Sequence, residues 1–335
     1  MTTDPADLAL TITRAIHLAA LLSAFGILAF WNLVAPPVLQ TAGPAQRASI
    51  ESAFLRLLHA SLALSLATAV IWLATQAAVM AEPDTVGDAE AAIWPVLTDT
   101  HFGHILGLRF LLILGALLTV GNGSQGWRLK LGAILAGLGL ILHAWATHAA
   151  AAQGMDRPIL LATESLHLAA AGAWLGSLAP LFIVVGRLPA SQGAMAARRF
   201  SPLGMLCAAA LTATALIQSG FLIGGWTGLI DRDYGLVALV KLAILAVLLS
   251  LAAMNRFRHL PAMSSSESAD ARRRLRRNIG LETAAGLAAV LAAAFLSSLP
   301  PARHSQSASR MSLPMLAEIG QSSQFEHGIL APARS

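Results

Sequence analysis

The chain alternates between long apolar runs and short polar links, and this pattern predicts a bundle of transmembrane helices. An apolar run of about 20 residues is long enough to cross the hydrocarbon core of a bilayer as an α-helix. The links between the runs carry the glycine, proline and charged residues that end helices. We expect eight spans, at Leu8–Val34, Ala53–Met80, His104–Val120, Leu129–His148, Ile159–Val185, Phe200–Gly224, Leu236–Met254 and Ile279–Leu299.

Composition agrees with this pattern and narrows the class of protein. Hydrophobic residues make up 56% of the chain and charged residues 12%, with a mean hydropathy of +0.68. These values indicate an all-α, polytopic transmembrane helix bundle that lies in a lipid bilayer. The single cysteine, Cys207, excludes a disulfide framework within the chain and a metal site built from several cysteines. The chain lacks a Gly-x-x-x-x-Gly-Lys-Ser/Thr motif for ATP, and we expect it not to be an enzyme.

The net charge of +5 arises from arginine and lysine residues that gather in the short links. This distribution is typical of the charge bias that orients a protein in a membrane, and it predicts no nucleic-acid partner. If the N-terminus lies outside, the inner links hold thirteen of these residues and the outer segments hold five. Because cytoplasmic links are enriched in Lys and Arg, both termini are predicted to lie outside, in the periplasm of a bacterium with two membranes. No signal peptide is evident, since Asp4 and Asp7 stand where a basic segment would be.

We divide the chain into three parts. An N-terminal half, 1–158, and a C-terminal half, 159–301, each hold four of the predicted spans. The remaining 302–335 is a polar tail that we expect to be disordered.

Ionisable residues inside the apolar runs mark a candidate functional site. Glu164 and His167 are three residues apart, so they lie on one face of a helix. The small residues at 169–173 that follow would let neighbouring backbones approach closely. Arg109 and Lys241 also lie deep within spans and are expected to face a partner or a water-filled cavity. An ionisable group in hydrocarbon is costly, which makes such positions functional candidates.

Six of the ten histidines fall at one depth in the predicted topology, within roughly 14 Å of the outer surface. Imidazole and carboxylate ligands suit Cu, Zn, Fe or Ni, and copper binds such donors most tightly among these divalent ions. We therefore predict a copper ion site near the periplasmic side. Its expected ligands are His17, His104, His143 and His167, with Glu164 as a ligand or as the group that orients His167, and with His101 and His148 as contacts on the access side.

Other interpretations of these histidines stay open. A histidine near an interface is often only hydrated, and a deeper one often makes a hydrogen bond between helices. Paired histidines on neighbouring helices also ligate haem, so a b-type haem electron carrier using His104 with His167, or His17 with His143, is an alternative. A third is a sensor or assembly protein that binds copper without transporting it. The tryptophans near span ends are expected to be interface anchors; these are Trp31, Trp94, Trp127, Trp145 and Trp226.

Several motifs, in order, resemble the CopD/PcoD family of copper-resistance inner-membrane proteins. The first is Thr-His-Phe-Gly-His at 100–104, followed by Gly-Leu-Arg at 107–109. The second is Leu-His-Leu-Ala-Ala at 166–170 with Trp174-Leu175-Gly176 and Pro180, where Ser177 replaces a glycine common in the family. The most specific region is 195–301, which includes Arg198-Arg199-Phe200-Ser201, Asp233-Tyr234-Gly235, Lys241, Asn255-Arg256, Arg273–Arg277, Glu282 and Pro300-Pro301.

The resemblance implies a multi-pass protein of the bacterial inner membrane that handles copper. It also implies a separate periplasmic copper-binding partner of the CopC type, because some family members carry that domain fused and this sequence shows none. Copper import from the periplasm toward the cytoplasm, in copper homeostasis and resistance, is the function that the resemblance predicts.

Overall fold

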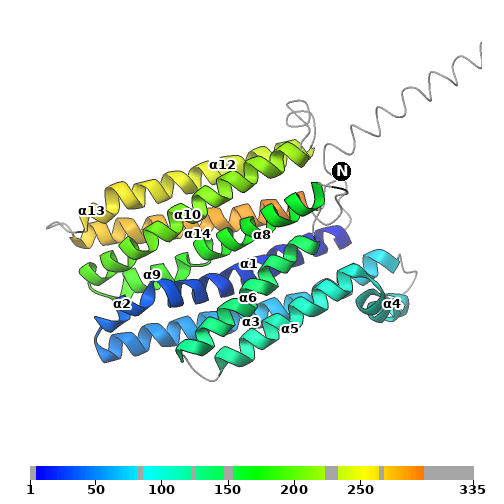
Figure 1. Cartoon of the computed structure of the whole chain (residues 1–335), viewed down its shortest axis with the longest axis horizontal. Helices are drawn as coiled ribbons and strands as arrows, with labels where there is room; N and C mark the ends of the chain where they lie inside the picture. Colours follow the sequence, from blue (N-terminus) through cyan, green and yellow to red (C-terminus); the bar gives the residue numbers. More distant parts are fainter. Residues whose placement is uncertain are drawn as a thin grey trace, which may run out of the picture.

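The computed structural model describes residues 5–81, 86–121, 125–146, 154, 156–222, 233–263 and 268–297, and in these ranges every regular element is helical. Figure 1 shows the helices lying side by side along the long axis of the molecule. The elements are α1 (Pro5–Leu33), α2 (Ala35–Gln40), α3 (Pro44–Ala81), α4 (Val86–Asp99), α5 (His101–Gly121), α6 (Gly126–Ile141), η1 (Leu142–Ala146), α8 (Asp156–Leu175), α9 (Leu178–Arg187), α10 (Ala190–Leu222), α12 (Asp233–Met254), η2 (Asn255–His259), α13 (Leu260–Ala262) and α14 (Ser268–Leu296).

Eight segments of the described chain are long and apolar enough to cross a membrane, which confirms the predicted all-α bundle of eight spans. The largest differences lie at helix starts. α3 begins at Pro44 instead of Ala53, α10 at Ala190 instead of Phe200, and α14 at Ser268 instead of Ile279. Hydropathy marks only the stretch that matches the thickness of the bilayer, whereas these helices continue through polar and basic residues beyond it.

α4 is an element that the hydropathy pattern did not predict, because its segment carries Asp88, Glu90 and Asp99 and was expected to be a link. It packs against α3 and α5. A Cβ on Gly103 of α5 would lie 2.1 Å from the backbone oxygen of Val96, so only glycine permits this close approach. In Figure 1, α4 lies at one end of the bundle, and α2 and α13 lie at the other. We name these the α4 end and the α2 end.

α1 lies at the centre of the bundle, where it packs against α3, α6, α8 and α14 and so joins both halves of the chain. It approaches the end of α8 closely, because a Cβ on Gly26 would lie 2.2 Å from the carbonyl carbon of Gly176, the residue that follows α8. Ser177 donates a hydrogen bond from its Oγ to the Gly26 carbonyl oxygen at 2.9 Å. This hydrogen bond holds the break between α8 and α9 against α1.

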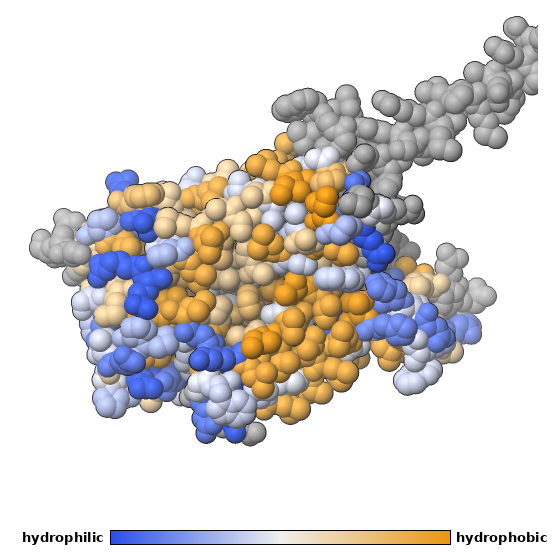
Figure 2. Space-filling model, in the orientation of Figure 1, coloured by the Kyte–Doolittle hydropathy of each residue, from blue (hydrophilic) through white to orange (hydrophobic). Residues whose placement is uncertain are grey.

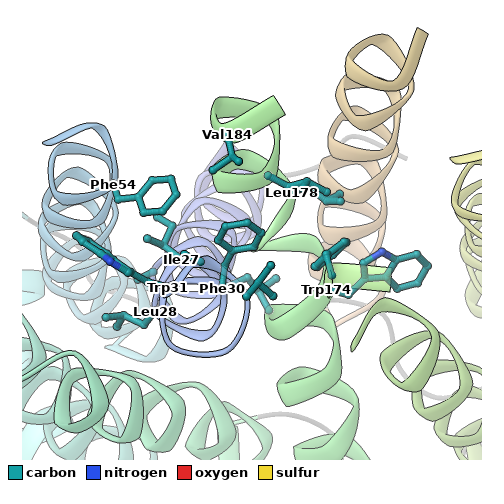
Figure 3. Close-up of a cluster of buried hydrophobic side chains, with 14 of the residues drawn as sticks. Ile27, Leu28, Phe30, Trp31, Phe54, Trp174, Leu178 and Val184 are labelled. Carbon is teal, nitrogen blue, oxygen red and sulfur yellow. The ribbon is translucent and has the colours of Figure 1, made fainter. Parts of the chain in front are cut away.

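Aromatic side chains fill the core around α1, α3, α8 and α9 (Figure 3). The Phe54 ring stacks edge-on against both Phe30 and Trp31, with ring centroids 5.9 and 5.2 Å apart. Trp31 is only 4% exposed, so the expectation that it anchors the bundle at an interface is wrong. The contact with Phe54 provides the physical reason, because it gives the indole a packed apolar site inside the bundle.

The surface of the bundle is apolar along its middle and polar at its ends (Figure 2). Exposed leucines such as Leu111, Leu206 and Leu287 belong to this apolar belt. Such a belt is stable only against lipid, because a soluble protein rarely exposes a continuous apolar patch of this kind.

Candidate functional site

A cavity of about 450 Å³ opens between the helices toward the α4 end of the bundle. Its walls come from α1, α3, η1, α8, α10, α12 and α14, so nearly every span contributes to it. Most of the lining is aliphatic. The polar and charged side chains that line it include Arg14, His143, Glu164, His167, Gln218 and Lys241.

Glu164 and His167 reach this cavity from one face of α8, as their spacing predicts. The glycine contact between α1 and α8 holds that face in the centre of the bundle. His167 Nδ1 lies 2.8 Å from the Thr214 hydroxyl on α10. Thr214 donates its single hydroxyl proton to the Ala210 carbonyl oxygen, so its oxygen accepts from His167 Nδ1–H. The free lone pair of His167 is therefore on Nε2, one of the two nitrogens through which neutral histidine can bind a metal.

His143 reaches the cavity from η1, the 3₁₀ turn that ends α6. It is 9% exposed, and its Nδ1 has no hydrogen-bond partner in the described part of the chain. Its ring lies against Trp72, with centroids 5.7 Å apart. His143 thus offers a buried nitrogen that no described residue occupies.

His17 lies behind the cavity wall, and both of its ring nitrogens are occupied. Its Nε2 is 2.8 Å from Arg109 Nη2, and because a guanidinium can only donate, Nε2 accepts. Nδ1 then carries the proton and donates to the Ser65 carbonyl oxygen at 3.0 Å. His17 therefore holds Arg109 in this arrangement and presents no free lone pair.

Arg109 is completely buried, as its depth in the sequence suggests. Its Nε donates to the Gly139 carbonyl oxygen at 3.0 Å, and its guanidinium lies 5.6 Å from the Trp72 ring centroid. Arg14 lies at the same distance from that ring and also donates to Gln76. Trp72 therefore contacts two arginines and two histidines from three elements, α1, α5 and η1.

Lys241 lines the cavity on α12, within electrostatic range of Glu164 and His167. No ion pair within 4 Å joins Lys241 to Glu164 in the described ranges. The two opposite charges therefore share the cavity without direct contact. A positively charged ligand in this cavity would compete with Lys241 for the field of Glu164.

The other predicted site residues lie elsewhere. His101 and His104 are exposed at the start of α5, where His104 Nε2 donates to the Thr98 carbonyl oxygen at 2.6 Å. His148 lies outside the described residues. Among the described residues, no three His, Cys, Asp or Glu side chains converge closely enough to hold a metal ion. The structure thus brings His143, Glu164 and His167 to one cavity, and places His17, His101 and His104 outside it.

Sequence reasoning missed Trp72, Thr214 and Gln218. Trp72 has a sequence signal that could have identified it: it lies eight residues inside the end of its span at Met80, away from the interface positions that tryptophan favours in membranes. In the structure it is 1% exposed. Thr214 and Gln218 are four residues apart on α10 and so lie on one face. Their partnership with α8 depends on tertiary packing, which the sequence pattern does not encode.

Comparison with known proteins identifies the family. The model of "Copper resistance protein D-like, N-terminal domain" matches residues 4–158, and the model of "Copper resistance protein D" matches residues 194–296. Copper resistance protein D of Pseudomonas syringae pv. tomato is 25% identical over 272 residues, which cover 77% of this chain and 88% of that protein. Inner membrane protein YebZ of Escherichia coli (strain K12) is 26% identical over 258 residues, covering 76% and 85%.

No solved structure matches the chain. The two family models lie in the expected order along the sequence and together cover most of it. The relatives align over most of their own length, and the eight apolar helices agree with a place in the inner membrane. The chain is a multi-pass inner-membrane protein that belongs to the copper resistance protein D family.

Proposed function

We propose that this protein binds copper ions in the cavity at the α4 end and moves them across the inner membrane toward the cytoplasm. One observation carries the proposal: His143, Glu164 and His167 line a single cavity in a chain of the copper resistance protein D family. Imidazole nitrogens with one carboxylate are donors that suit copper. A buried aliphatic wall around few polar groups is typical of a binding cavity.

His143 and His167 are the proposed ligands. His167 presents Nε2 to copper because Thr214 holds its Nδ1 proton. His143 presents its Nδ1, which has no hydrogen-bond partner among the described residues. The three donors do not converge in this conformation, so binding requires that η1 and α8 bring their side chains together around the ion.

Glu164 supplies the negative charge that the cavity requires. A copper cation placed near Lys241 meets like-charge repulsion that is strong in a low-dielectric interior. The Glu164 carboxylate offsets this repulsion, as a ligand or by orienting His167. Arg109 and His17 lie behind the wall, and we assign them a supporting role in place of direct ligation.

The α4 end is the proposed periplasmic side. The excess of Lys and Arg lies on links at the α2 end, so the positive-inside rule puts the α4 end outside. Exposed His101 and His104 then face the periplasm beside acidic α4, where a CopC-type copper-binding protein would deliver its ion.

Copper binding and uptake test the proposal separately. We would measure bound copper on the purified protein and copper uptake into proteoliposomes, for the parent, His167→Ala and a control, His59→Ala. His59 lies on α3 and does not line the cavity. We expect His167→Ala to lose binding and uptake and His59→Ala to keep both. Equal binding by the parent and His167→Ala would contradict the site, and binding without uptake in the parent would indicate a sensor or assembly protein.

A further inference from the structure

A second cavity, of about 190 Å³, lies toward the α2 end and is separate from the copper cavity. Its polar lining consists of Ser201, Asn255, Arg256 and Glu282. The remaining walls are mainly aliphatic and aromatic side chains of α8, α9, α10, α12, α13 and α14. We call this the Glu282 chamber.

Glu282 is only 2% exposed, although it lies five residues beyond Arg277 at the basic start of α14, about 8 Å along the helix axis. Asn255 Nδ2 donates a hydrogen bond to its carboxylate oxygen Oε1. No ion pair compensates Glu282 in the described part of the chain. A buried carboxylate without a paired cation is costly in a membrane protein, so this position is a functional candidate.

Asn255 can satisfy Glu282 in either protonation state. Its Nδ2 donates to Glu282 Oε1, an arrangement that suits the ionised carboxylate. Its Oδ1 is buried and has no partner among the described residues. A protonated Glu282 could donate its O–H to that oxygen after a rotation of the amide, since the amide carries both donors and an acceptor. The Asn255 side chain can thus form a hydrogen bond with Glu282 whether or not Glu282 carries a proton.

Asn255 also begins η2, a π-helical turn in which the Leu260 N–H donates to the Asn255 carbonyl oxygen. Single π-helical turns within α-helices occur frequently at functional sites. Here the turn lies between α12 and α13 and packs against α14, which carries Glu282. The π-helical turn η2 is therefore the part of this segment that contacts Glu282.

Few other charged groups face Glu282. Arg256 lines the same chamber but donates to the Ser201 hydroxyl. On the neighbouring elements, Arg258, Arg198 and Arg199 are exposed, and His259 is buried without lining the chamber. On α14 itself, Arg276 stacks on Phe182 at 4.2 Å. Arg256 is therefore the cation positioned to approach Glu282 when its carboxyl group becomes charged.

We propose that the Glu282 chamber is a proton-binding site that exchanges protons with the solution at the α2 end as copper moves. The carboxyl group releases one proton to become a carboxylate, and Arg256 leaves Ser201 to approach the new charge. The geometry alone supports proton binding at Glu282, whereas the coupling of that proton to copper movement rests on the proposed function. Release of a proton would offset the charge of a copper cation within the low-dielectric bundle.

Infrared spectroscopy of the full chain in lipid nanodiscs tests the proton site without copper. We would record the protonated-carboxyl C=O band as the pH of the solution changes, for the parent, Glu282→Gln and Glu164→Gln. We expect a band that titrates in the parent and in Glu164→Gln and is absent in Glu282→Gln. Glu282→Asp keeps a carboxyl and should retain a titrating band at a shifted frequency. Identical titrating bands in the parent and Glu282→Gln would overturn the proposal.

The coupling is tested in proteoliposomes that contain a pH-sensitive dye. Copper uptake by the parent should be accompanied by proton movement, and Glu282→Gln should abolish that movement while binding copper like the parent in detergent. Uptake with unchanged proton movement in Glu282→Gln would overturn the coupling. A parent that neither binds nor takes up copper would contradict the proposed function and leave the infrared result to decide the proton site.

Discussion

Arg109 Nη2 lies 2.8 Å from His17 Nε2, and this hydrogen bond joins α5 to α1 in the interior of the bundle. Both side chains are 0% exposed. A buried guanidinium requires acceptors, and in the described part of the chain those of Arg109 are the His17 ring nitrogen and the Gly139 backbone carbonyl oxygen. The pair therefore has a structural role next to the cavity.

The first prediction separates this role from copper ligation. His17→Ala leaves Arg109 without its imidazole acceptor and should lower the free energy of unfolding by about 1–3 kcal/mol. His17→Gln restores an acceptor oxygen and should recover part of the loss. Thermal unfolding in detergent measures both variants. A His17→Ala protein as stable as the parent that has lost copper binding would instead make His17 a ligand.

The second prediction concerns Glu164, the carboxylate of the copper cavity. Glu164→Gln removes the charge while keeping the shape, and should weaken copper binding by roughly 10–100-fold. Glu51→Gln is the matched control, because Glu51 pairs with Arg47 at 2.9 Å outside the cavity. Competition with a copper chelator would measure both. Equal losses in the two variants would show that the effect is not specific to the cavity.

The third prediction concerns Lys241, which faces the same cavity. Lys241→Met removes a cation that repels copper and competes for Glu164, so copper should bind more tightly, on the order of tenfold or about 1.4 kcal/mol. Lys130, exposed on α6, is the other lysine of the chain and provides the control Lys130→Met. Weaker copper binding in Lys241→Met would contradict the electrostatic account.

The fourth prediction concerns the contact between α1 and α8. A Cβ on Gly176 would lie 2.0 Å from the Leu22 backbone oxygen, so Gly176→Ala should destabilise the bundle by about 1–3 kcal/mol. Gly280→Ala is the control, because its Cβ would meet nothing within 4 Å. Melting temperatures of the two variants should therefore differ. Equal melting temperatures would show that the helices separate to accept the methyl group.

The apolar pattern predicts the eight spans because each must match the thickness of a bilayer. It does not predict α4, whose amphipathic segment meets the bundle through Gly103. The spacing of Glu164 and His167 places both on one helix face without knowledge of the fold. In contrast, the partnerships of His17 with Arg109 and of His167 with Thr214 join residues 92 and 47 positions apart. Such pairs depend on which helices become neighbours.

Copper content and the absorption spectrum of the purified, detergent-solubilised protein test the central claim most directly, with His167→Ala measured beside the parent. The account predicts that the parent retains copper, that His167→Ala loses it, and that neither shows a Soret band. A Soret band with stoichiometric iron would contradict the account and identify a b-type haem carrier. Copper retained equally by both proteins would contradict the assignment of the cavity.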